Sequence, residues 1–530
     1  MGAMTIGPNF NPAHPFYQSA IRFPQRLAMS AEQTDLTYFE SGVLVRNLAA
    51  MLRRTSGLPA RRVGILASRS IEACIGVLGA CWAGAIYVPL SLRQAEDRLL
   101  SVLELAEIDA LVADARGAEL LSEQVLSACP NLVFVPDQDI ARRLKPRKEQ
   151  NIHRLDALDK SPNDHQPAFV GAEDIAYIMF TSGTTGTPKG VMVSAGALHQ
   201  YISVTQEQYR ILPEDRVAET IDLSFDLSVS NMFTTWNAGA SLQIVSTTNS
   251  ISPAKVIRDK GATVWLTTPS SIAVMKRLKA LRPGMLPDLR LTLFCGEPLP
   301  LSSVISWREA APNSRIDNLY GPTEATVACL WQRVAEKPLV TPEREIVAIG
   351  APYPGMEAAI VDDKLEFLPP RMHGELALSG PQLSKGYLAK PDLTVARFPT
   401  IGGKRWYLTG DVAYQDESGI FHHLGRIDHQ VKVRGFRVEL EDVESHMRSV
   451  CGTELVAAVA WPIAHGSAEG IVGFIAGKEI DPAIVLEGLR TRLTSYMLPT
   501  AIHSLAEMPL SANGKIDRKA LLTRLDEEGS

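Results

Sequence analysis

The protein has 530 residues, of which 45% are hydrophobic and 21% charged, and its formal net charge is −6. This is the composition of an ordinary globular protein with room for several domains. The Lys and Arg residues nearly balance the Asp and Glu residues and are dispersed, which argues against a dedicated nucleic-acid binder.

The cysteines and the apolar runs indicate a cytoplasmic protein without a membrane span. The cysteines lie far apart and form no Cys-x-x-Cys pair, so we expect reduced thiols and no zinc site. They are Cys74, Cys81, Cys129, Cys295, Cys329 and Cys451. The chain does not open with a basic stretch and an apolar core, so no secretory signal is visible. The apolar run at 73–90 contains three glycines and Pro89, and we expect it to form a buried helix and strand.

Short apolar runs alternate with amphipathic stretches over the first part of the chain. This alternation predicts a largely parallel sheet covered by helices, in a layered α/β architecture. The expected strands are 63–67, 86–89, 110–113 and 132–135, and the expected helices are 39–52, 71–83 and 97–106. The charged, proline-bearing stretch 136–167 is expected to be a surface connection.

From residue 374 the pattern changes to short strands and turns, at 374–379, 406–409 and 419–423. A domain boundary is expected near 426–430. Beyond it we expect helices at 439–450 and 482–495, strands at 455–461 and 471–476, and a terminal turn and helix at 510–525. The sequence therefore predicts a large α/β domain with a small β-rich subdomain over 1–427, and a small α+β domain over 428–530.

The most informative segment is a Ser/Thr/Gly-rich turn that follows an apolar strand at 175–180. It reads Thr181-Ser182-Gly183-Thr184-Thr185-Gly186-Thr187-Pro188-Lys189-Gly190. In such a turn backbone N–H groups and hydroxyls converge on phosphate oxygens, and Lys189 supplies a compensating charge. The spacing is not that of a Walker A loop, in which Ser or Thr follows the Gly-Lys pair. The alternative interpretation is a glycine-rich surface turn.

Taken whole, this turn resembles the phosphate loop of the adenylate-forming enzymes, which include acyl-CoA synthetases, luciferases and nonribosomal-peptide adenylation domains. Further motifs of that family occur in order over essentially the whole chain. They are Leu36-Thr37-Tyr38, Ala83-Gly84-Ala85-Ile86-Tyr87-Val88-Pro89, Phe225-Asp226-Leu227-Ser228, Asn318-Leu319-Tyr320-Gly321-Pro322-Thr323-Glu324, Gly374-Glu375-Leu376, Lys385-Gly386-Tyr387-Leu388, Tyr407-Leu408-Thr409-Gly410-Asp411, Gly425-Arg426-Ile427-Asp428 and Asn513-Gly514-Lys515-Ile516-Asp517-Arg518. The resemblance implies an enzyme that uses ATP and Mg²⁺ and has a mobile carboxy-terminal domain.

The resemblance also implies the residues of the nucleotide site. Tyr320 would stack on adenine, Glu324 would hold Mg²⁺, and Asp411 with Arg426 would bind the ribose and phosphate. A core tyrosine and surface ion pairs are the alternative interpretations. The nucleotide-binding set is Thr181, Ser182, Gly183, Thr184, Gly186, Gly296, Glu297, Asn318, Leu319, Tyr320, Gly321, Thr323, Asp411, His423 and Arg426, and the catalytic set is Thr185, Lys189, Glu324 and Lys515.

A hinge is implied at Asp428. In one conformation of the family Lys515 bridges the substrate carboxylate and the α-phosphate, and in the rotated conformation the face that carries Lys432 replaces it. A compact ammonium suits the first task because it stabilises the charge that develops on the transferred groups. A solvated lysine in a terminal turn is the alternative interpretation of Lys515.

Asp226 indicates the class of substrate. In amino-acid-activating members an Asp at this position pairs with the substrate α-ammonium, which fatty-acid and aryl-acid ligases do not have to neutralise. A buried carboxylate without a cationic partner would be costly. The alternative is that Asp226 only caps a helix that begins near Val229.

The side-chain pocket implied around Asp226 is small and apolar. Its residues are Leu227, Ser230, Leu266, Leu293, Cys295, Leu319, Val327 and Ala328, closed by Lys515. Because the lining has no second charge, we expect a small aliphatic or cyclic side chain. The Cys295 region resembles D-alanine–carrier protein ligases, whereas the leucines with Asp226 and Val327 resemble stand-alone prolyl-AMP ligases. Ser230 matches neither, so alanine, proline, a valine-sized amino acid and a β-amino acid all stay open.

We therefore expect a stand-alone enzyme of nonribosomal-peptide type that activates a small amino acid as its aminoacyl-AMP. The chain ends about a dozen residues after Arg518, so a carrier protein with its phosphopantetheine thiol is expected to act in trans. No nucleic-acid or membrane partner is expected, and the protein is expected to be a monomer or weak dimer. The alternatives are an acyl- or aryl-CoA ligase in which Asp226 is incidental, and a nucleotide-binding scaffold without activity.

Overall fold

The computed structural model describes most of the chain. The described residues are 8–32, 34–54, 61–161, 165–181, 188–246, 253–342, 344–427, 430–453, 455–464, 467–476, 480–509 and 516–528. Seven residues of the predicted site lie outside these ranges, namely Ser182, Gly183, Thr184, Thr185, Gly186, Asp428 and Lys515. In the part of the chain that is described, no helix combines the length and the apolarity needed to cross a membrane.

The first predicted sheet is present, with strand order β7-β6-β5-β3-β4-β8-β9. Its strands pair in parallel except for the antiparallel pair of β8 and β9. The strands are β3 (Arg62–Leu66), β4 (Ile86–Pro89), β5 (Ala110–Ala113), β6 (Leu132–Val135), β7 (Asn151–Arg154), β8 (Ile175–Thr181) and β9 (Lys189–Ser194). Central strands of a parallel sheet are buried on both faces, which is why β5 and β6 are uninterrupted apolar runs.

The prediction that 136–167 only connects two folded units is wrong. This stretch contains α7 (Gln138–Arg143) and β7, which extends the sheet by pairing in parallel with β6. Because β7 is an edge strand, its side chains are only partly buried. Backbone hydrogen bonds rather than an apolar pattern hold it in place, so hydrophobic periodicity does not reveal it.

A second sheet has the strand order β18-β15-β14-β13-β12-β10-β11-β1-β2, with a parallel centre from β14 to β1. Its strands are β1 (Leu27–Ala31), β2 (Thr34–Thr37), β10 (Arg216–Glu219), β11 (Ser241–Ile244), β12 (Val264–Thr267), β13 (Leu291–Phe294), β14 (Arg315–Tyr320), β15 (Leu330–Arg333) and β18 (Ala351–Pro352). The carboxyl ends of parallel strands share one edge, where α/β proteins bind their ligands. Cys295 and Tyr320 lie at this edge, at the ends of β13 and β14.

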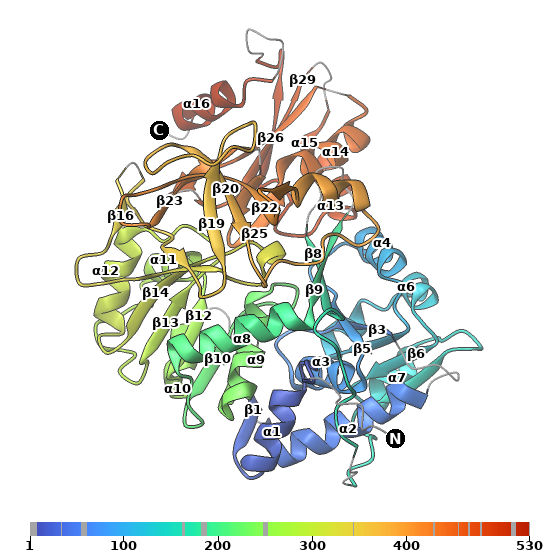
Figure 1. The fold of residues 1–530 in the computed structure, drawn as a ribbon. Helices are drawn as coiled ribbons and strands as arrows, with labels where there is room; N and C mark the ends of the chain where they lie inside the picture. The colour runs from blue at the N-terminus through green and yellow to red at the C-terminus, as the bar shows by residue number, and fades with distance from the viewer. Residues whose placement is uncertain are drawn as a thin grey trace.

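The main hydrophobic core lies between the two sheets. Figure 1 shows α8 and α9 between them, and this core joins residues of both sheets to residues of α1, α2, α3, α8 and α9.

Helix α3 matches the prediction at both ends: Ser70 caps its first turn by accepting from the Ala73 N–H, and Gly84 ends it at φ 81°. The helices of this part are α1 (His14–Arg22), α2 (Tyr38–Arg54), α3 (Ile71–Ala83), α4 (Glu96–Ala106), α5 (Ala115–Glu119), α6 (Glu123–Ala128), α8 (Ala195–Tyr209), α9 (Leu227–Ala238), α10 (Pro253–Asp259), α11 (Pro269–Arg277), α12 (Leu301–Ala310) and the 3₁₀ helix η3 (Thr323–Ala325).

The expected β-rich subdomain is a sheet of order β19-β20-β22-β21, in which β23 also pairs with β22. Its elements are β19 (Glu357–Val361), β20 (Gly374–Ser379), β21 (Thr400–Ile401), β22 (Lys404–Gln415), β23 (Phe421–Arg426) and α13 (Pro391–Arg397), with the separate pair β16 (Val340–Thr341) and β17 (Ile346–Val347) nearby in the chain. The predicted strand 406–409 is only part of the longer β22.

The smaller carboxy-terminal domain begins with a β-hairpin, β24 (Gln430–Val433) and β25 (Phe436–Glu439), and is drawn in orange to red in Figure 1. Its other elements are β26 (Val456–Ala460), β27 (Ile463–Ala464), β28 (Ser467–Ala468), β29 (Ile471–Ala476), β30 (Ala501–Leu505), α14 (Leu440–Cys451), α15 (Pro482–Arg490) and α16 (Arg518–Glu528). The helix predicted to run to Ser495 ends at Arg490. The chain beyond it turns toward the large domain, where the Ser495 N–H donates to the Arg93 carbonyl over 3.3 Å.

Candidate active site

A cavity of about 320 Å³ gathers most of the predicted nucleotide-binding residues. Its walls come from the ends of β13 and β14, from β22 and β23, and from β24 of the small domain. The predicted residues that line it are Gly296, Glu297, Asn318, Leu319, Tyr320, Gly321, Asp411, His423, Arg426 and Lys432. Segments more than 130 positions apart in the sequence therefore meet in one site.

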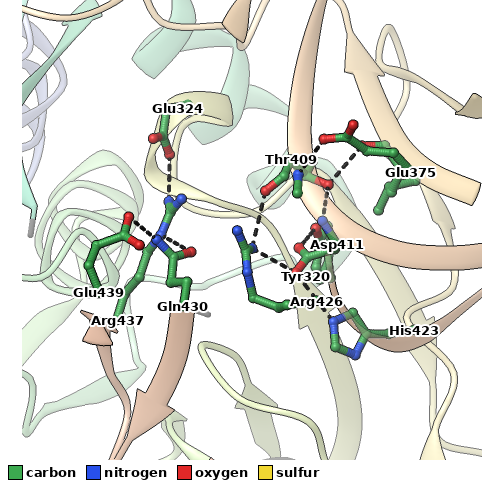
Figure 2. A network of polar contacts seen from close by, with 12 residues as sticks. Tyr320, Glu324, Glu375, Thr409, Asp411, His423, Arg426, Gln430, Arg437 and Glu439 are labelled. Atoms are coloured by element: carbon green, nitrogen blue, oxygen red, sulfur yellow. Dashed lines mark hydrogen bonds and ion pairs between the residues drawn. The ribbon is translucent and has the colours of Figure 1, made fainter. Parts of the chain in front are cut away.

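Asp411 is the centre of a polar network in this cavity (Figure 2). The Tyr320 hydroxyl donates to its Oδ2, and Arg426 donates to its Oδ1 over 2.8 Å. Burial alone would raise the pKa of Asp411, but the hydrogen bond from His423 and the charge of Arg426 bring it well below its ordinary value. The carboxylate is therefore ionised and held from both oxygens, which is compatible with the predicted pairing to ribose hydroxyls.

His423 joins the network as a neutral donor. Burial lowers its pKa, so the ring is uncharged near neutral pH. Arg344 lies 2.7 Å from Nδ1 and can only donate, so Nε2 carries the hydrogen and points at Oδ1 of Asp411 over 3.4 Å. Sequence reasoning missed Arg344, which lines the same cavity.

Two ion pairs cross from the large domain to the small one beside Lys189 of the predicted phosphate loop, at what we call the phosphate end of the site. Glu324, fully buried in η3, accepts from Arg437 over 3.0 Å and from the Tyr387 hydroxyl over 2.8 Å. Lys189 donates to Glu439 over 3.0 Å. Although burial opposes it, the charges of Arg437 and Lys189 lower the pKa of Glu324, so its carboxylate is ionised.

Sequence reasoning missed Arg437 and Glu439, and the helix predicted to begin at 439 begins at Leu440. They belong to β25, and β24 pairs with β25 in the register Gln430 with Glu439 and Lys432 with Arg437. Gln430 links the two ion pairs by accepting from Arg437 and donating to Glu439, each over 2.5 Å (Figure 2). The alternation of these polar residues with valines was the available signal, since alternate residues of a strand share one face.

Lys432 occupies the same polar face of the hairpin. Lys432 lines the cavity and is partly buried, and desolvation lowers its pKa although the charges of Asp411 and Glu297 oppose the change. A desolvated ammonium at this position can stabilise negative charge on a neighbouring group.

Asp226 lies at the amino terminus of α9, one residue before Leu227. It accepts no capping hydrogen bond from the described backbone, which contradicts the alternative that it only caps the helix. Among the described residues its Oδ2 is buried without a hydrogen-bond partner. Burial raises the pKa of Asp226 to about 6, the charge of Glu324 adds to this, and a hydrogen bond from Thr323 opposes it. Such a carboxylate gains most from a cationic ligand.

The residues predicted to form the side-chain pocket are all buried, and they come from α9, β12, β13, β14 and the turn after η3. These residues are Leu227, Ser230, Leu266, Leu293, Cys295, Leu319, Val327 and Ala328. Leu266 and Leu293 are register partners on neighbouring parallel strands. Tyr201 of α8, which sequence reasoning missed, contacts this set by donating its hydroxyl to Ser230 Oγ over 2.8 Å.

A smaller cavity of about 80 Å³ links the phosphate end to Asp226. Thr181 and Thr323 of the predicted nucleotide set line it together with Asp226 and Arg437. Among the described residues no group of three or more His, Cys, Asp or Glu could hold a metal ion. A single ionised carboxylate at Glu324 nevertheless fits Mg²⁺, which binds through one or two carboxylates together with substrate phosphates.

Comparison with known proteins gives the family. The model of the AMP-binding enzyme family matches residues 16–388. The chain is 33% identical to tyrocidine synthase 2 of Brevibacillus parabrevis over 97% of its length, and 35% identical to the antimetabolite synthetase AmbB of Pseudomonas aeruginosa over 96%. It spans 14% of the first of these relatives and 38% of the second.

A solved structure is similar over its full length. The adenylation domain AlmE of Vibrio cholerae, in complex with glycyl-adenosine-5'-phosphate, superimposes with a TM-score of 0.88 at 30% identity, covering 99% of this chain and 100% of that one. The layered large domain and smaller carboxy-terminal domain predicted from the sequence are thereby confirmed. The chain belongs to the AMP-binding enzyme family, whose members form adenylates.

Proposed function

We propose that the protein activates a small amino acid with ATP to give the aminoacyl-AMP, and then transfers the aminoacyl group to the phosphopantetheine thiol of a separate carrier protein. The observation that carries this proposal is Asp226. Its carboxylate is buried, its pKa is raised to about 6, and the rest of the predicted pocket brings no second charge. A substrate α-ammonium would relieve the cost of that burial.

The pocket supports a substrate with a small side chain. The residues proposed to surround the substrate side chain are each at most 8% exposed, and Ser230 is already engaged by the Tyr201 hydroxyl, which leaves room only for a small group. AlmE was solved with a glycyl adenylate, which also favours the smallest amino acids. We propose glycine, alanine and proline as the leading candidates, with valine-sized and β-amino acids behind them.

In the first half-reaction the substrate carboxylate attacks the α-phosphorus of ATP, and pyrophosphate leaves. We propose that residues 181–189 hold the phosphates, that Asp411 and Arg426 hold the ribose, and that Lys515 bridges the carboxylate and α-phosphate. Positioning and charge neutralisation dominate such chemistry. Bound at Glu324, Mg²⁺ would neutralise part of the phosphate charge.

In the second half-reaction the carrier thiol attacks the carbonyl carbon of the mixed anhydride, and AMP leaves. We propose that the domain of residues 428–530 rotates about Asp428 between the steps, so that Lys432 takes its place in the site. A cavity of about 560 Å³ supports access for the thiol, because it shares Glu297 and Pro298 with the nucleotide cavity. Its basic residues suit a phosphate-bearing arm, and they are Arg69, Arg93, Lys276, Arg277 and Arg434.

The proposal is tested by amino-acid-dependent exchange of pyrophosphate into ATP. The panel contains glycine, both alanine enantiomers, L-proline, L-valine, a β-amino acid, and an aliphatic and an aromatic carboxylic acid. Exchange with one small amino acid, lost in Asp226→Asn, is the expected result. Exchange only with an acid that lacks an amino group would contradict the pairing with Asp226 and indicate an acyl- or aryl-CoA ligase.

A further inference from the structure

The turn that follows η3 has an unusual backbone. Thr326 and Val327 have φ values of 56° and 68°. Both are β-branched, and such residues at positive φ are strained conformers that persist only where the surroundings impose them. Both are also buried, at 0% and 1% exposure. The strain lies directly between Glu324 and the pocket residue Ala328.

One side chain holds this turn. Gln382, in the loop between β20 and α13, is fully buried. Its Nε2 lies 2.8 Å from the carbonyl of Ala328, 3.3 Å from that of Ala325 and 3.4 Å from that of Thr326. In return the Thr326 hydroxyl donates to the backbone carbonyl of Gln382 over 2.6 Å. A single amide thus satisfies backbone carbonyls on both sides of the strained residues.

The same loop also fixes Glu324. The Ser384 N–H donates to the Glu324 carbonyl over 2.8 Å, and the Tyr387 hydroxyl donates to Oε1 over 2.8 Å. The turn packs against the nucleotide site as well, because a Cβ on Gly321 would lie 2.5 Å from the Ala328 Cα. A shift of the turn would therefore be transmitted to the pocket wall and to the nucleotide cavity.

We infer that Gln382 is a positioning residue: its amide holds the strained turn 325–328 in the conformation that presents Val327 and Ala328 to the substrate side chain. The inference rests on the proposed function, since it assigns these residues to the amino-acid pocket. Without the amide, the turn relaxes toward negative φ and the pocket loses its shape. Selectivity for a small side chain then depends on a residue that does not touch the substrate.

The test is a double-variant cycle between Gln382→Met and Thr326→Gly, with exchange measured for the preferred amino acid and for leucine. Glycine adopts positive φ without strain, so Thr326→Gly removes much of the backbone strain that Gln382 must hold in place. We expect Gln382→Met to lower kcat/KM about tenfold in the natural background and less than about threefold in the Thr326→Gly background. The KM for the amino acid should rise more than the KM for ATP, and the preference over leucine should narrow. Gln124→Met, at an exposed glutamine, is the matched control.

Equal losses in both backgrounds, or equal rises in both KM values, would overturn the inference. If Gln382→Met alone does not fold, the double variant is expected to fold, and failure of both also overturns it. Absence of exchange with every amino acid in the unsubstituted protein would instead contradict the proposed function. In that case the free energy of unfolding is measured for the unsubstituted protein, the two single variants and the double variant. If the two substitutions lower it non-additively, Gln382 holds the turn, and if their effects add, that role is rejected.

Discussion

The ammonium of Lys189 lies 3.0 Å from the Glu439 carboxylate, although the two residues are 250 positions apart and belong to different domains. Both side chains are largely buried, at 10% and 6% exposure. Breaking a buried pair by removing one charge is costly because the other charge is left unmatched. The pair therefore stabilises the particular arrangement of domains in which Lys432 faces the nucleotide cavity.

Glu439→Gln should consequently separate the two half-reactions. We expect thioester formation to slow by about tenfold, which corresponds to about 1.4 kcal/mol, while pyrophosphate exchange changes less than about threefold. The rates are measured by carrier loading and by exchange. Glu441→Gln, at an exposed glutamate two residues further on, should change neither rate. Equal slowing of both half-reactions by Glu439→Gln would contradict this assignment.

The two lysines of the small domain should show opposite effects. Lys515→Ala is expected to reduce adenylate formation by about 100-fold or more and to spare the reaction of a preformed adenylate with the carrier thiol. Lys432→Ala is expected to slow that second step and to leave exchange within about threefold. Single-turnover assays that start from a synthetic aminoacyl-AMP separate the steps. A lysine whose removal affects both steps alike would not have the role proposed for it.

Amino-acid use should depend on the ionisation of Asp226. Its pKa is raised to about 6, and only the ionised form pairs with a substrate ammonium. We therefore expect kcat/KM for the amino acid to fall about tenfold per pH unit below that value and to be constant above it. Exchange is measured at saturating ATP across this range. If kcat/KM for the amino acid does not change down to a full pH unit below the pKa, Asp226 is not the partner of the substrate ammonium.

Asp226 should also reduce the stability of the protein. A carboxyl whose pKa rises from its ordinary 3.8 to about 6 holds its proton more tightly in the folded state. Stability therefore falls as pH rises through this window, by on the order of 3 kcal/mol. Asp226→Asn should raise the thermal midpoint at neutral pH and above, lose this advantage near pH 4, and abolish exchange. A variant that is less stable than the unsubstituted protein at neutral pH would contradict the prediction.

The network around Asp411 predicts a change in nucleotide affinity. Asp411→Asn keeps the shape of the side chain but loses the charge that pairs with Arg426 and one of the two oxygens that accept from Arg426 and the Tyr320 hydroxyl. We expect the KM for ATP to rise by about tenfold or more, with a smaller change in the KM for the amino acid. Asp363→Asn, at an exposed aspartate, is the control. An unchanged KM for ATP would exclude Asp411 from the ribose site.

Much of the site could be predicted because its residues lie in short motifs at strand ends. Tyr320 is the last residue of β14 and Arg426 is the last residue of β23, and both line one cavity although the two strands belong to different sheets. The parallel sheet was predictable for a related reason, since buried strands such as β5 and β6 are apolar throughout. The edge strand β7 was not predictable from the sequence, because backbone hydrogen bonds hold an edge strand in the sheet and it needs no apolar pattern.

The remaining residues depend on tertiary contacts that no local pattern encodes. Glu439 follows an apolar alternation and precedes a helix, and nothing near it in the chain indicates that its partner is Lys189. Tyr201 and Gln382 touch the site through single hydrogen-bonded groups from elements that carry no recognisable motif for that role. The positive φ of Val327 likewise opposes the local preference of valine and is imposed from outside the turn.

The hairpin β24–β25 adds a cation and an anion to the phosphate end, and the order of these charges matters. Arg437 meets the carboxylate of Glu324, and Glu439 meets the ammonium of Lys189, so the contact has a polarity but no net charge. If the two hairpin residues were exchanged, like charges would face each other at both positions. These two ion pairs therefore add no net charge to each other, and their order selects one orientation of the docked hairpin.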